Sequence, residues 1–121
     1  MPFEWISNEP VYNEKYISID REKRFFISAE AARLLGIKSF PEPVYIAYDH
    51  ANKQIAVARV DNVKLDGVRP YRFSDRRYSS ARPFLRKTDI SESELPQRYI
   101  YVGRDDSIDV PGGAFVFELE D

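Results

Sequence analysis

Hydrophobic and polar residues alternate in several short segments of the first half of the chain, the pattern of strands buried on one face. In KYISID, Ile17 and Ile19 alternate with polar positions, and RFFIS, VYIAYD and QIAVARV are further β-prone runs. The turn residues HANK separate the last two runs, which predicts a β-hairpin with His50 near its tip. The segment AEAARLLGI instead has helical spacing, with Ser28 as its N-cap and Gly36 as its stop.

The second half of the chain repeats this order of patterns. PYRFSD follows the pattern of KYISID, SSARPFLRKTDI that of FISAEAARLLGI, RYIYVG that of VYIAYD, and GAFVFELE that of the strand before residue 60. Aligned in this way, Tyr16 matches Tyr71 and Asp20 matches Asp75. Two copies are too few for a solenoid but fit a pair of halves related by a pseudo-twofold axis within one chain.

We therefore expect a mostly β domain with two short helices (α+β), built from tandem β-β-α-β-β halves. Residues 1–121 are expected to form a single domain. Its parts are an N-terminal arm (1–15), a first half (16–60), a connector (61–70) and a second, divergent half (71–121). Trp5 in the arm is expected to pack in the core, and an exposed, partner-binding Trp5 is the alternative.

The composition narrows the function classes. The chain has no Cys and one His, which excludes disulfides, thiolate chemistry and a His-rich metal site. It lacks a Walker A loop, a dinucleotide fingerprint and a nucleophile elbow, so we expect a non-enzymatic protein without metal or cofactor. No apolar run is long enough for a membrane helix or a signal peptide, so we expect a cytoplasmic protein with no membrane partner.

Charge is distributed unevenly along a chain whose net charge is −2. Residues 69–87 contain seven basic residues and one acid, and residues 88–121 contain two basic and nine acidic residues. The arginines of the basic segment suit a phosphate backbone, a protein or a small anionic ligand. Alternatively, they form a solvated face or pair with the acids of the C-terminal segment: Asp105, Asp106, Asp109, Glu118, Glu120 and Asp121. The aromatic residues of the basic segment are expected in the core.

The run IDREKRFFISAEAARLLGI, followed by VYIAYDHANKQIAV, resembles the AbrB/MazE class of swapped-hairpin domains. This resemblance implies dimers with interleaved hairpins, in which arginines of the first hairpin and the short helix contact DNA. Arg24 and Arg33 match two of those positions, whereas Ile17 and Ala32 occupy two others. A looser likeness connects the chain to small phage and prophage proteins.

Taken together, these patterns predict a binding protein of a phage or mobile element that engages nucleic acid through an arginine-rich face. The face consists of Arg24, Arg33, Arg72, Arg76, Arg77, Arg82 and Arg86. The alternative is a protein-interaction module that inhibits a host or defence protein through Trp5, Asp105 and Asp106. A third option is a binder of small anionic ligands, and a homo-oligomer is compatible with each of the three.

Overall fold

The structure is a computed structural model that describes residues 2–6, 15–62, 65–105 and 114–120. Its strands are β1 (Tyr16–Ile19), β2 (Arg24–Ile27), β3 (Glu42–Asp49), β4 (Gln54–Arg59), β5 (Tyr71–Phe73), β6 (Tyr78–Ser80), β7 (Gln97–Asp105) and β8 (Ala114–Leu119). Its helices are α1 (Ala29–Leu34) and α2 (Arg82–Thr88), and two 3-10 turns are η1 (Val60–Asn62) and η2 (Glu92–Glu94). The prediction of a mostly β fold with two short helices is confirmed.

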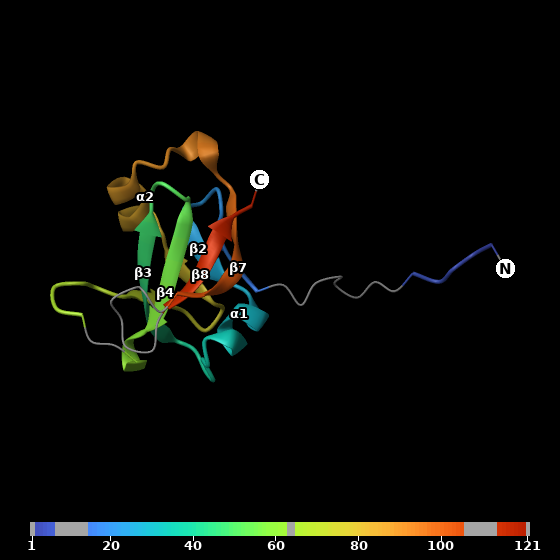
Figure 1. Cartoon of the computed structure of the whole chain (residues 1–121), viewed down its shortest axis with the longest axis horizontal. Helices are drawn as coiled ribbons and strands as arrows, with labels where there is room; N and C mark the ends of the chain where they lie inside the picture. Colours follow the sequence, from blue (N-terminus) through green and yellow to red (C-terminus); the bar gives the residue numbers. More distant parts are fainter. Residues whose placement is uncertain (1, 7–14, 63–64, 106–113, 121) are drawn as a thin grey trace.

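The strands of the described residues form one antiparallel sheet in the order β5-β3-β4-β8-β7-β1-β2-β6. The two outermost strands, β5 and β6, are consecutive in the chain and meet at a tight turn. In this turn the amide of Ser74 donates to the carbonyl of Tyr78 at 2.8 Å, and the amide of Arg77 donates to the carbonyl of Ser74 at 2.8 Å. The sheet therefore curls into a nearly closed barrel, and Figure 1 shows α1 and α2 at its opposite ends.

The core fills the interior of the barrel because alternate strand residues point inward. Ile17 and Phe25, on neighbouring strands, are fully buried, whereas Phe26 faces outward and is half-buried. The ring of Phe25 meets the rings of Tyr71 and Phe84 edge-on, at centroid distances of 5.3 and 5.1 Å. The central aromatic cluster thus joins residues from the two halves of the chain.

When β5 and β6 are counted as neighbours through their turn, the strands form a ring whose order stays the same if every strand is exchanged for the one four places away in the chain. β1 pairs with β7, and β5, its counterpart in this exchange, pairs with β3. In these pairings Ile17 lies opposite Tyr99, and Tyr71 lies opposite Val44. Outside their own hairpin, β1 and β2 therefore pair only with strands of the second half, β7 and β6. Likewise, β5 and β6 pair only with strands of the first half, β3 and β2.

The β1–β2 and β5–β6 turns share one backbone geometry. Lys23 and Arg77 have positive φ values of 63° and 68°. The amide of Lys23 donates to the carbonyl of Asp20 at 3.0 Å, just as Arg77 donates to Ser74 at 2.8 Å. The turns therefore match Asp20 with Ser74, one residue away from the match with Asp75 that the sequence predicts.

The N-terminal segment differs from the prediction. Phe3, Trp5 and Ile6 are 86%, 98% and 81% exposed, so the expected core packing of Trp5 is wrong.

Two local predictions are confirmed. Gly36, with a φ of 78°, follows the end of α1, and His50 is exposed in the turn between β3 and β4. None of the helices in the described ranges combines the length and the apolar character needed to cross a bilayer.

Candidate nucleic-acid interface

A hollow of ≈ 250 Å³ beside α2 brings together cations from both halves of the chain. Lys23, Arg82 and Arg86 line it together with Glu92, and Leu85 and Ile90 supply its apolar part. Arg82 and Arg86 are one helical turn apart and therefore share a face of α2, while Phe84 and Leu85 of the same helix are buried. We call this group of side chains, with Lys23 and Glu92, the α2 hollow.

Lys23 reaches the α2 hollow because the β1–β2 turn is attached to the beginning of α2. Its carbonyl accepts a hydrogen bond from the amide of Ala81 at 2.8 Å. One carboxylate oxygen of Asp20 accepts from the amides of Glu22 and Arg24, both at 3.0 Å, and so holds the turn in shape. The backbone of the first half thus positions a cation against the helix of the second half.

Glu92 is the acidic residue in the α2 hollow. It forms an ion pair with Lys23, and its own side chain is 73% exposed while that of Lys23 is 27% exposed. The hydrogen bond from Lys23 lowers the pKa of Glu92, and the charges of Lys23 and then Arg82 lower it further. Three cations face one carboxylate in this hollow, so it keeps a net positive charge.

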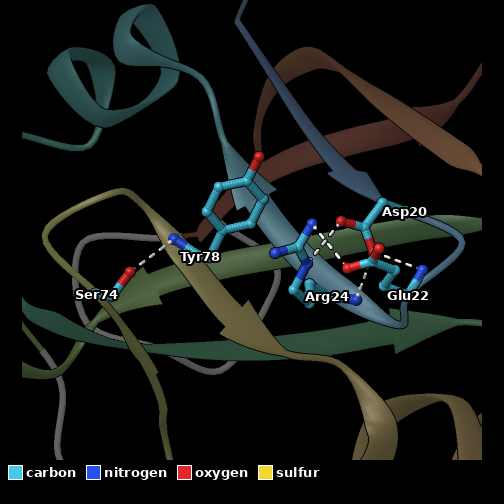
Figure 2. A network of polar contacts seen from close by, with 5 residues as sticks. All are labelled: Asp20, Glu22, Arg24, Ser74 and Tyr78. Atoms are coloured by element: carbon cyan, nitrogen blue, oxygen red, sulfur yellow. Dashed lines mark hydrogen bonds and ion pairs between the residues drawn. The ribbon is translucent and has the colours of Figure 1, made fainter.

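Arg24 is held by acids of its own hairpin. Its Nε donates to Asp20 at 2.9 Å, and its terminal nitrogen lies 3.3 Å from a carboxylate oxygen of Glu22. Figure 2 shows this guanidinium between the two carboxylates and the ring of Tyr78, whose centroid is 4.4 Å from the guanidinium carbon. The hydrogen bond to Asp20 raises the pKa of Arg24. This arginine stabilises the outer face of β2 and β6, and its charge is neutralised locally.

Two more of the predicted arginines have structural partners at the other end of the barrel. Arg33 pairs with Glu30 on α1. Arg77 donates its Nε to the carbonyl of Ile27 at 3.1 Å and covers the ring of Phe26 at 5.3 Å. Since α1 and α2 lie at opposite ends of the barrel (Figure 1), the seven predicted arginines do not form one continuous face.

Six of the seven predicted arginines are exposed, all except Arg77, and four of these six are available to a ligand: Arg72, Arg76, Arg82 and Arg86. Within the described ranges, their side chains form no hydrogen bond or close ion pair, although the charge of Arg82 acts on Glu92. Arg72 lies on β5 and Arg76 in the turn that follows it, whereas Arg82 and Arg86 share the α2 hollow. Two of the four available arginines, Arg82 and Arg86, thus line the hollow together with Lys23, a cation that was not predicted from the sequence.

The acids that pair with Arg24 and Arg33 come from nearby residues, and the described acids of the C-terminal strand have other partners. Glu118 accepts a hydrogen bond from Gln54 at 3.3 Å, and Glu120 lies 3.7 Å from Arg98. Asp105 is the last residue of β7, and Asp106, Asp109 and Asp121 fall outside the described residues, as does most of the predicted loop between β7 and β8. Among the described residues, no group of acidic or His side chains has the arrangement of a metal site.

The aromatic residues of the basic segment divide into two groups. Phe73 and Phe84 are buried, as predicted, whereas Tyr78 lies outside the barrel under Arg24. Lys23 and Glu92 are the members of the site that sequence reasoning missed. Matching the two turns would have indicated Lys23 as the counterpart of Arg77, but no local signal connects Lys23 with a glutamate 69 positions later.

No protein-family model, curated protein or solved structure shows a significant match to this chain. The resemblance to the AbrB/MazE class therefore stays a prediction from the sequence.

Proposed function

We propose that the chain is a non-enzymatic nucleic-acid-binding protein, regulator-like and of a phage or mobile element, made of two AbrB-like halves. Support for the halves comes from the ring of strands closed at the β5–β6 turn, whose order is unchanged by the exchange of β1–β4 with β5–β8. The exchanged hairpins match what the AbrB/MazE resemblance implies for a dimer. A single chain with this arrangement presents the surface that two identical chains would otherwise form.

The observation that carries the nucleic-acid proposal is the convergence of Lys23, Arg82 and Arg86 on one hollow. Guanidinium groups donate several hydrogen bonds in a planar fork, which suits phosphate oxygens, and an ammonium adds a point charge. Arg24 and Arg33 match the DNA-contacting positions of the AbrB resemblance, but acids of the same half hold them here. We therefore expect the contact surface to lie at the α2 end.

The test measures binding of fluorescently labelled duplex and single-stranded DNA by anisotropy at several salt concentrations. Arg82→Gln combined with Arg86→Gln should weaken binding and reduce the slope of log K against log salt by about 1.8 for duplex DNA, since each phosphate contact contributes about 0.9. The control, Lys15→Gln combined with Lys53→Asn, removes the same charge at exposed positions outside the α2 hollow. Lack of binding by the unmodified protein to either DNA near physiological salt would refute the proposal, as would equal losses in the two double variants.

A second candidate function is favoured by the exposure of Phe3, Trp5 and Ile6. Exposed aromatic side chains are typical anchors of protein interfaces, where the loss of one often costs about 2 kcal/mol or more. An inhibitor of a host or defence protein would use such an anchor. Affinity capture from cell extract should then yield a partner that Trp5→Ala loses and the Arg82/Arg86 double variant keeps. Retention of the partner by Trp5→Ala would argue against this segment as the anchor.

A further inference from the structure

The α2 hollow holds an anion of its own. The carboxylate of Glu92 stands at its rim, against the partly buried ammonium of Lys23 and within the field of Arg82. A carboxylate and a phosphate accept the same charge-assisted hydrogen bonds from lysine and arginine. Glu92 therefore satisfies Lys23 in the way that an oxygen of a bound phosphate would.

The backbone around Glu92 is fixed, whereas its side chain can leave. Ser91 and Glu94 form a capping box that fixes the η2 turn, in which the amide of Ser91 donates to Glu94 at 2.7 Å. Among the described residues, Lys23 is the only one that pairs with the Glu92 carboxylate. A pair as exposed as this one contributes little to stability, so breaking it costs little.

We infer that the α2 hollow is a site for one phosphate group, which Lys23, Arg82 and Arg86 hold after the Glu92 carboxylate has moved away. This inference rests on the proposed function, because it names the chemical group that the nucleic-acid interface recognises. Glu92 and the phosphate exclude each other by charge repulsion and by competition for Lys23. Glu92 therefore lowers the affinity of the site and reduces adventitious occupation by weak anions.

The phosphate comes from a nucleic-acid backbone in this proposal, although a free nucleotide or inorganic phosphate offers the same group. A backbone phosphate gains from additional contacts with neighbouring cations, whereas a small anion has only the hollow. The two sources are separated by titrating inorganic phosphate, adenosine monophosphate and a short DNA duplex in parallel.

The structure provides a closely matched control for Glu92. Asp61 also lies in a 3-10 turn, pairs with a partly buried cation, Arg59, and has a side chain that is 74% exposed, against 73% for Glu92. Glu92→Gln and Asp61→Asn change the net charge equally and each removes one exposed ion pair, although Arg59 keeps a second partner, Glu42, at 3.1 Å. A difference in anion binding between these variants thus reports on the α2 hollow and not on overall charge.

The experiment uses the full chain, labelled with nitrogen-15, and follows backbone amides during the three titrations at constant ionic strength. Amides of residues 82–92 and of the β1–β2 turn should shift with the duplex. Glu92→Gln should bind the duplex roughly two- to fivefold more tightly than the unmodified chain, the range expected from an exposed ion pair, and Asp61→Asn should remain close to the unmodified chain. The double variant Glu92→Gln/Arg82→Gln should lose most of the increase in duplex affinity that Glu92→Gln alone produces.

The outcomes separate the inference from the function on which it rests. Duplex binding with equal affinities in Glu92→Gln and Asp61→Asn would overturn the inference and leave the proposed function intact. Absence of duplex binding, with inorganic phosphate still shifting residues 82–92 more strongly in Glu92→Gln, would support the phosphate site and refute the nucleic-acid function. If both variants have the melting temperature of the unmodified chain and none of the three ligands shifts these amides, both proposals fail.

Discussion

Replacement of Phe25 by Ala tests whether the two halves of the barrel share one core. The ring is fully buried, and loss of such a ring costs about 3–5 kcal/mol of unfolding free energy. Its two edge-on neighbours, Tyr71 and Phe84, belong to the second half, and each such pair contributes about 0.5–1.5 kcal/mol beyond the buried area. We therefore expect a loss in the upper part of that range, about 4–5 kcal/mol.

Phe26→Ala is the matched control, because Phe26 is the next residue of β2 and faces outward. Its ring contacts Tyr78 at 5.0 Å and is half-buried, so we expect a loss of about 1–2 kcal/mol. Urea unfolding followed by circular dichroism gives the two values. Both variants should keep the unfolding slope of the unmodified chain, since the interlocked halves unfold together. Equal losses in the two variants would mean that the inward and outward faces of β2 are assigned wrongly, and two separate transitions would mean that the halves fold independently.

Three further predictions concern a cap, an acid and the N-terminal segment. Ser28→Ala removes the acceptor of the Ala31 and Tyr16 amides, both at 3.1 Å, and should lower the free energy of unfolding in urea by about 1–2 kcal/mol. The control Ser39→Ala, at an exposed position, should change this free energy by less than about 0.5 kcal/mol. Equal effects of the two substitutions would contradict the capping role of Ser28. Hydrogen bonds from Asn52 lower the pKa of Asp49 below its usual 3.8. The ionised Asp49 carboxylate therefore stabilises the folded state fully above pH 3.8, and this contribution is lost as the pH falls through the lower pKa of the folded state. Asp49→Asn should therefore lose less stability than the unmodified chain on acidification below pH 3.8, and parallel urea midpoints at all pH values would refute this. Trp5 is the sole tryptophan, so the emission of the free protein should be that of a hydrated indole with full quenching by iodide, whereas protected emission would show that Trp5 is covered.

Most of the local structure could be predicted from the sequence because it depends on neighbouring residues. The alternation in KYISID indicated β1, and the Ser28 cap and Gly36 stop delimited α1, as the structure has them. Such features depend on strand and helix periodicity and on hydrogen bonds within a few positions. The common face of Arg82 and Arg86 followed from helical spacing alone in the same way.

The candidate site could be predicted only in part, because the availability of each arginine depends on its partners. The sequence treats Arg24 and Arg86 alike, yet Arg24 lies between two carboxylates and a tyrosine ring, whereas Arg86 opens onto the α2 hollow. The position of Tyr78 outside the barrel likewise follows from the pairing of β6 with β2. The two carboxylates lie within four residues of Arg24, but the tyrosine ring that covers Arg24 and the lysine beside Arg86 come from distant parts of the chain and have no signal in the neighbouring residues.

Periodicity and composition determine the strands, the helices, their order and the amount of positive charge in residues 69–87. The pairing of strands far apart in the chain determines where that charge is available. It brings Lys23 to α2 and Glu92 to Lys23, and thereby defines the only cluster of cations for which we propose a ligand. The physical reason is that caps and side-chain spacing depend on residues a few positions apart in the chain. The ion pair between Lys23 and Glu92 depends instead on their distance in space, which is set when the strands close into the barrel.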